Sequence, residues 1–189
     1  MARPLSEEKR EALLAAASNL VASLGTGAST AKIAEAAGVS EGTLFTYFAT
    51  KDELLNQLFM EINNHLAETM LAPYPEAEAP RDQLRQIWNR LIDWGLKNPE
   101  NRKAMRQLKV SDRVTAESRR HGKAVLSDAR KMVERCLAGH AAPDRASLYI
   151  DTILFGLAEI TINAITAAPK KDKIIRQAAF DLFWKGTAA

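Results

Sequence analysis

Hydrophobic residues recur every three or four positions along most of this chain, which is the spacing that places them on one face of an α-helix. The first such run covers residues 6–24, where Leu13, Ala17 and Val21 share a face and Gly25 follows as a stop signal. No segment alternates apolar and polar residues as a half-buried strand does, so the pattern predicts an all-α fold. Further helices are predicted over residues 51–71, 80–97, 98–110, 111–138, 143–168 and 170–185, with a bend at Gly122 and a flexible, proline-punctuated loop over 73–80.

Residues 29–51 contain two short helical patterns separated by a tight turn. Ser29 and Ser40 are suited to cap the two helices, because a serine hydroxyl can accept a hydrogen bond from an amide of the first turn. Gly38 tolerates the positive φ that ends the first helix, and the small Ala34 lets the two helices cross closely. These features together predict a helix-turn-helix.

This segment resembles the DNA-binding segment of the TetR family of bacterial transcriptional regulators. The resemblance covers about fifty N-terminal residues, and beyond them the chain fits the family only in length, helical content and its ending at 180–186. It implies a three-helix DNA-binding domain over 1–50 and a larger helical ligand-binding and dimerisation domain over 51–189. The residues that carry it are Ile33-Ala34, Ala37-Gly38-Val39-Ser40 and Gly42-Thr43-Leu44-Phe45-Thr46-Tyr47-Phe48, followed by Lys51, Leu54 and Leu55.

The resemblance identifies 40–47 as the recognition helix that enters the major groove of DNA. Gly42 permits close approach to the bases, and Phe45 can contact a thymine methyl group. Tyr47 and Lys51 match positions that hold phosphates, one through its hydroxyl and one through its charge. The complete set of expected DNA contacts is Ser29, Thr30, Lys32, Ser40, Glu41, Gly42, Thr43, Phe45, Thr46, Tyr47 and Lys51.

Glu41 has two interpretations. Its carboxylate can accept a hydrogen bond from a cytosine amine. Alternatively, it favours the positive end of the helix dipole and faces away from the bases, since phosphates repel an unpaired carboxylate.

The helix over 143–168 is apolar on more than one face, and such a helix must be covered on both sides. A second subunit would supply that cover, with this helix and 170–185 from each subunit forming a four-helix interface, and the resemblance implies the same homodimer. The alternative is a helix that forms the core of a monomer. The expected interface residues are Ile153, Leu154, Leu157, Ile160, Ile174, Ala178 and Leu182.

The resemblance also implies regulation by a small molecule that lowers affinity for a palindromic operator, and therefore repression. Only Ala49 and Thr50 join the recognition helix to the helix that begins at Lys51. A ligand that tilts this helix must therefore move the DNA-binding domain of residues 1–50, called the reading head below. The alternative for each candidate pocket residue is a place in the plain hydrophobic core. The candidates are Leu58, Ile62, His65, Leu66, Trp88, Leu91, Trp94, Met105 and Met132.

Charge distribution leaves one alternative function open. Through Thr50 the chain has four basic residues against five acidic ones, although a DNA-binding surface is usually basic. A helical interaction or sensor protein that has lost DNA affinity therefore remains the competing hypothesis. Residues 97–135 carry twelve lysines and arginines against five acids, which fits either a solvated face or a site for an acidic effector.

The sequence gives no indication of an enzyme, a cofactor or a metal site. His65, His121 and His140 lack the ligand spacing of a metal centre, and nucleophile-elbow and phosphate-loop motifs are missing from the sequence. Cys136 lies on an apolar stripe, where it is either inert core or a redox sensor. We found no signal peptide and no apolar run judged long enough to span a membrane, so a cytoplasmic protein is expected.

Overall fold

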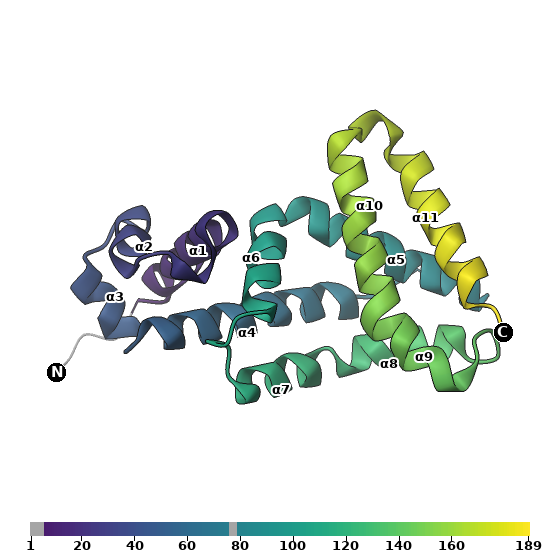
Figure 1. Ribbon diagram of the computed structural model, residues 1–189, viewed down its shortest axis with the longest axis horizontal. Coiled ribbons are helices and arrows are strands. Elements are labelled where there is room, and N and C mark those ends of the chain that lie inside the picture. Colours follow the sequence, from purple (N-terminus) through teal and green to yellow (C-terminus); the bar gives the residue numbers. More distant parts are fainter. Residues whose placement is uncertain (1–5, 76–78) are drawn as a thin grey trace. The chain divides into compact units, whose positions relative to one another are not determined.

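The computed structural model describes residues 6–75 and 79–189, and this part of the chain is helical throughout, without a strand (Figure 1). Most helix bounds agree with the sequence prediction within two residues, because capping residues and prolines mark them. The α-helices are α1 Glu7–Leu24, α2 Thr30–Ala36, α3 Glu41–Tyr47, α4 Lys51–Leu71, α5 Pro80–Lys97, α6 Pro99–Lys109, α7 Ala116–Val125, α8 Ser127–Leu137, α9 Ala146–Leu148, α10 Phe155–Ala167 and α11 Asp172–Thr187. Short turns of other helix types are η1 Gly25–Gly27, η2 Pro143–Arg145, the π-helical η3 Tyr149–Leu154 and η4 Pro169–Lys171.

The chain forms two compact units whose ranges interleave in the sequence. The first unit comprises the described residues up to His65 together with Asn98–Val125, and the second comprises the described residues of Leu66–Lys97 and Leu126–Ala189. The division expected after residue 50 separates the helix-turn-helix from the helices that follow it. The compact units divide elsewhere, because α6 and α7 pack with the N-terminal helices.

In the first unit, α1 packs along α6. Leu13, Ala17 and Val21 are fully buried on the face of α1 that the sequence pattern indicated. Ser18 Oγ donates a hydrogen bond to Asn101 Oδ1 at 2.6 Å, which joins α1 to α6 by a polar contact inside this packing. Helix α1 therefore packs on a helix that begins seventy-five residues after α1 ends.

Helix α7 lies against α4 in the same unit. A Cβ atom on Gly122 would come within 3.1 Å of the side chains of Asn63 and Phe59, so glycine is what allows the two helices to approach this closely. The predicted bend at Gly122 is wrong, because α7 continues to Val125 and the break between α7 and α8 falls at Leu126.

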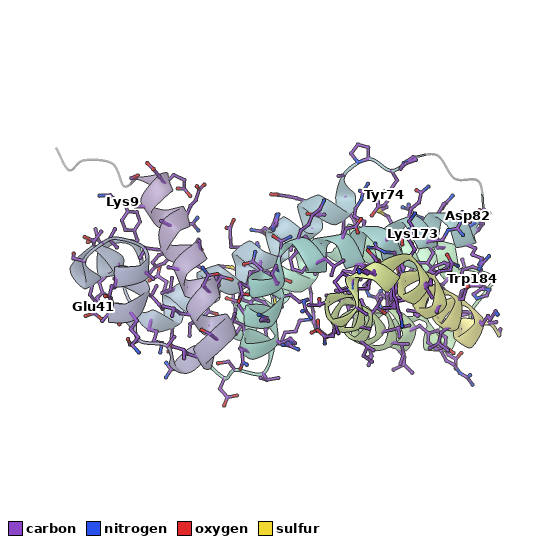
Figure 2. The ribbon with its side chains drawn as sticks, turned by 90° about the horizontal axis from the view of Figure 1, so that it is seen from above. Lys9, Glu41, Tyr74, Asp82, Lys173 and Trp184 are labelled. Atoms are coloured by element: carbon purple, nitrogen blue, oxygen red, sulfur yellow. The ribbon has the colours of Figure 1, made fainter. Side chains whose placement is uncertain are left out.

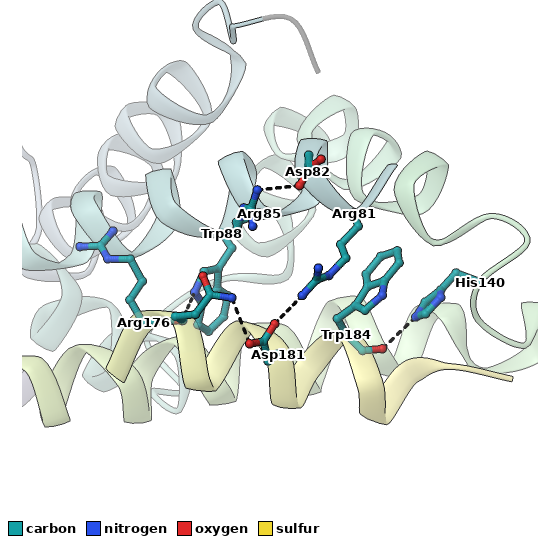
Figure 3. Close-up of polar contacts among 9 residues, drawn as sticks. Arg81, Asp82, Arg85, Trp88, His140, Arg176, Asp181 and Trp184 are labelled. Carbon is teal, nitrogen blue, oxygen red and sulfur yellow. Dashed lines mark hydrogen bonds and ion pairs between the residues drawn. The ribbon is translucent and has the colours of Figure 1, made fainter. Parts of the chain in front are cut away.

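In the second unit, α5 is surrounded by α8, α10 and α11. Trp88 is fully buried, and its indole N–H donates a hydrogen bond to the carbonyl of Arg176 on α11 at 3.3 Å. Arg81 pairs with Asp181 at 2.6 Å, and the ring of His140 stacks on Trp184 while its Nε2 lies 2.8 Å from the Trp184 carbonyl (Figure 3). Polar contacts along the whole of α11 thus fix this helix to the core.

The described part of the predicted flexible loop is held in place. Arg90 of α5 stacks over the ring of Tyr74 with 3.6 Å between the guanidinium carbon and the ring centroid, and it donates hydrogen bonds to the carbonyls of Ala72 and Pro73. Tyr74 donates its hydroxyl hydrogen to the carbonyl of Met70 at 2.8 Å. Residues 76–78 of the predicted loop lie outside the described part.

Residues 143–167 form one continuous helical run. By length and composition alone this run could cross a membrane, with a mean hydropathy of 1.5 in its most apolar window, a third of which is buried within the chain. The expectation that no apolar run reaches this length is therefore wrong. Asp151 and Glu159 interrupt the run, and Asp151 pairs with Arg130 of α8 at 3.0 Å.

Candidate DNA-binding site

Helices α2 and α3 are fixed to each other by their caps and by the turn between them. The Ser29 hydroxyl accepts from the amide of Lys32 at 3.3 Å, and the Ser40 hydroxyl accepts from the amide of Thr43 at 3.1 Å. Gly38 has φ +69°, and the amide of Val39 donates to the carbonyl of Ala34 at 3.0 Å. The helix-turn-helix predicted from these residues is confirmed.

Helix α3 buries one side and exposes the other. Leu44 is fully buried, whereas Phe45 is 43% exposed and presents an apolar ring to solvent. The hydroxyls of Thr43 and Thr46 already have partners, since Thr43 Oγ1 lies 2.9 Å from Ser40 Oγ and Thr46 donates to the carbonyl of Gly42 at 3.0 Å. Hydroxyl oxygens keep acceptor capacity when they donate, so DNA contacts would add to these bonds or replace them.

Glu41 is joined to α2 by its side chain. The hydroxyl of Thr30 donates to Glu41 Oε1 at 2.6 Å, a short bond of the kind that charged acceptors form. Glu41 is exposed at the surface of this unit (Figure 2). The bond occupies the one hydroxyl hydrogen of Thr30, so that Thr30 offers a phosphate no donor while the bond persists.

Tyr47 holds the beginning of α1. Its hydroxyl oxygen accepts a hydrogen bond from the amide of Ser6 at 2.9 Å, while Ser6 in turn caps α1 by accepting from the amide of Lys9. The hydroxyl hydrogen of Tyr47 takes no part in this bond and can donate to a phosphate.

Lys51 begins α4 directly beyond the helix-turn-helix. Burial lowers the pKa of its ammonium group, and the nearby charge of Arg113 lowers that pKa further, while Asp52 acts in the opposite direction. Glu53 completes the helix start: its amide donates to Thr50 Oγ1 at 3.0 Å and its carboxylate accepts from the amide of Ala49 at 2.8 Å. These bonds fix the three-residue link between α3 and α4.

All eleven predicted DNA-contacting residues thus belong to α2, α3, their caps and the first residue of α4, within one compact unit. Two side-chain contacts of these residues were not predicted from the sequence. Thr30 and Glu41 are eleven positions apart, and the crossing of α2 and α3 brings their side chains together. Arg113 follows Lys51 by sixty-two residues, and no local pattern connects the two.

Comparison with known proteins agrees with the resemblance found in residues 29–51. Residues 13–58 match the model of the family described as bacterial regulatory proteins, tetR family. A crystal structure from Shewanella sp. PV-4, described as a tetR family transcription regulator, is similar over 96% of this chain and 98% of its own, with 27% identity and a TM-score of 0.83. The chain belongs to the TetR family.

Two curated relatives match part of this TetR-family chain. One is the HTH-type transcriptional regulator BetI of Stenotrophomonas maltophilia, 38% identical over 81 residues, which make up 42% of this chain and 41% of BetI. The other is an uncharacterized HTH-type transcriptional regulator of Haemophilus influenzae, 32% identical over 68 residues, or 36% of each chain. The match thus spans well under half the length of these relatives.

The nine candidate pocket residues of the TetR-family chain are shared between its two units. Seven of them are buried, while His65 and Met132 are half-buried. Leu58, Ile62, His65 and Met105 belong to the first unit, and Leu66, Trp88, Leu91, Trp94 and Met132 belong to the second. The described residues contain no group of three or more His, Cys, Asp or Glu side chains that could hold a metal ion.

The candidate dimer residues form a mostly exposed set on η3, α10 and α11. Ile160 is 65% exposed, Ile174 71% and Leu182 65%, and Ile153 and Ala178 are exposed as well. Leu157 is half-buried. Leu154 differs from the rest, because it is buried in the core of its own subunit and has little surface to offer a partner.

Proposed function

We propose that the protein is a homodimeric transcriptional repressor that binds a palindromic operator and is released from it by a small molecule. The observation that carries this proposal is the capped helix-turn-helix with the exposed face of α3. Bonds at both ends of α3 limit its motion, so its side chains meet DNA without a large ordering cost. Phe45, Thr43 and Thr46 are available to the major groove, and Tyr47 and Lys51 to the adjacent phosphates.

The exposed apolar residues of α10 and α11 support the homodimer. Ile174, Ala178 and Leu182 follow one another at intervals of four, and Ile153, Leu157 and Ile160 follow at four and three, so each helix has one apolar stripe. Large apolar side chains exposed to this extent in one patch are typical of an interface. A homodimer implies an operator with two-fold symmetry, on which two recognition helices enter the major groove about 34–36 Å apart.

The exposed apolar side chains of α10 and α11 also suggest what covers the apolar run of residues 143–167. This run packs against α11, a helix that has an apolar stripe of its own and carries five charged residues. A second copy of α10 and α11 covers both stripes, whereas a bilayer would have to accept the charges of α11 beside them. We therefore assign this face to the dimer and the protein to the cytoplasm.

An inducer would act through its differential affinity for two conformations of the dimer. Within the first unit, the candidate ligand contacts are Leu58, Ile62 and His65 on α4 and Met105 on α6. A ligand that contacts α4 can move the reading head, since only Ala49 and Thr50 separate α4 from the C-cap residue of α3, Phe48. Ligands that raise the thermal stability of the protein should therefore lower its operator affinity.

DNA binding is tested by fluorescence anisotropy with duplexes from the region upstream of the gene, followed by footprinting of any bound duplex. The expected result is salt-sensitive binding and a protected site with two-fold symmetry. Failure to bind any of these duplexes at low salt would refute the proposal and favour a helical sensor protein without DNA affinity.

A further inference from the structure

A loop outside the helix-turn-helix is fixed beside the beginning of α4. Arg113 Nη1 lies 2.6 Å from Asp52 Oδ1, and Asn56 Nδ2 donates to the carbonyl of Arg113 at 2.8 Å. The amide of Thr115 donates to Asn56 Oδ1 at 2.9 Å, and Val114 between them is buried. Residues 113–115 are therefore held along the first two turns of α4, within the unit that contains the recognition helix.

The position of this loop matters because the reading head lacks positive charge. Residues 6–50 contain three lysines and arginines against five glutamates, and Lys51 is followed directly by Asp52 and Glu53. Residues 98–125 of the same unit contain eight lysines and arginines against three acids. Most of the cations of this unit, which could neutralise phosphates, therefore lie on α6, α7 and the loop between them.

Arg113 is the member of that group that pairs with Asp52 in the first turn of α4, beside Lys51. Its side chain is 48% exposed, and its ion pair with Asp52 is exposed to solvent, so the guanidinium can take a second anionic partner. The lowered pKa of Lys51, caused by burial and by the Arg113 charge, is consistent with two neighbouring cations at this position. A guanidinium also has five donors in a fork that matches phosphate oxygens.

We propose that Arg113 and Lys51 form an accessory phosphate-binding pair, through which the α6–α7 loop contacts the DNA backbone beside the bases that α3 reads. This inference rests on the proposed DNA-binding function. Asp52 orients the guanidinium in the free protein and shares it with a phosphate in the complex. The contact raises affinity for all sequences alike, because phosphates carry no base information.

The test is the salt dependence of DNA binding by the full-length protein, measured by anisotropy on one bound duplex between 50 and 200 mM salt. Each phosphate contact contributes about 0.9 to the slope of log K against log salt. Arg113→Gln should lower the slope by about 0.9 per subunit and weaken binding severalfold on every duplex, whereas Arg113→Lys should restore most of the slope. Lys131→Gln, which removes a cation paired with Asp128 on α8, is the matched control and should leave the slope unchanged.

Asp52→Asn separates a phosphate contact from a purely structural ion pair. Both Asp52→Asn and Arg113→Gln break the same pair, so a structural role predicts that the two variants lose affinity together at an unchanged slope. A phosphate contact predicts opposite effects, with tighter binding by Asp52→Asn because a repelling carboxylate is gone. Parallel losses, or an Arg113→Gln slope equal to that of the wild type, would overturn the inference. Absence of DNA binding by the wild type would instead refute the proposed function.

Discussion

Asn56 is a buried polar residue whose side chain joins α4 to the loop that carries Arg113. Its Nδ2 donates both to the carbonyl of Asp52 at 2.7 Å and to that of Arg113 at 2.8 Å, and its Oδ1 accepts from the amide of Thr115 at 2.9 Å. Two of these three bonds cross to the loop. Asn56→Ala removes both and leaves two backbone groups of the loop without their partner.

The expected cost follows from these bonds. Each intramolecular hydrogen bond contributes about 1 kcal/mol net, and an unsatisfied buried group costs about 1–3 kcal/mol. Because Thr115 is exposed and water can reach its amide, we expect Asn56→Ala to lower the free energy of unfolding by about 2–3 kcal/mol. Asn64 on the same helix is the control, since its carbonyl oxygen contacts only the exposed His121, at 3.1 Å, and Asn64→Ala should cost at most about 1 kcal/mol.

The assay is urea denaturation followed by circular dichroism, with all variants at one protein concentration because a dimer's stability depends on it. At a slope of about 2–3 kcal/mol/M, Asn56→Ala should lower the midpoint by about 1 M. Asn56→Asp should lose at least as much, because its carboxylate would face two carbonyl oxygens. Equal midpoints for Asn56→Ala and Asn64→Ala would refute the view that Asn56 fixes the loop.

Three further predictions concern the reading head, the dimer and the thiol. Glu41→Gln should tighten binding to all duplexes alike, because the carboxylate is bonded to Thr30 and acts on DNA as a repelling charge; an effect confined to one base pair in anisotropy titrations would instead make Glu41 a base reader. Ile160→Glu or Leu182→Glu should yield the 20.8 kDa monomer in light scattering, whereas Val110→Glu, at an 82% exposed position of the other unit, should not. Burial raises the pKa of Cys136, so its thiol should react slowly with a disulfide reagent at pH 8 until urea is added. The prediction of an inert thiol would be contradicted if an oxidant abolished DNA binding by the wild type but not by Cys136→Ser.

The helix-turn-helix could be predicted from sequence because local chemistry determines it. Ser29, Gly38 and Ser40 each act on a backbone group within five positions, and a single sequence shows such distances directly. The bounds of α5 were predicted for the same reason, since Pro80 begins it and Asn98-Pro99 starts the next helix.

Contacts between distant segments could not be predicted in this way. Gly122 was interpreted by its backbone freedom, whereas its role is to leave room for Phe59 and Asn63, sixty residues earlier. Leu154 lies on the same apolar helix as Ile160, and periodicity alone cannot tell which of the two faces the subunit's own core. A helix with apolar residues on several sides leaves that choice to its neighbours.

The interleaved units constrain how a signal can reach the reading head. The chain passes between the units three times, within α4 after His65, between α5 and α6 after Lys97, and between α7 and α8 after Val125. Only the first passage is inside a continuous helix, and three residues separate the start of that helix from the end of the recognition helix. The other two passages lead into α6 and α7, which pack on α1 and α4 and belong to the same unit as α3. Because α6, α7 and residues 113–115 belong to the same unit as α3, the proposed ligand response would change the base contacts and the accessory phosphate contact at once wherever it moves this unit on the DNA.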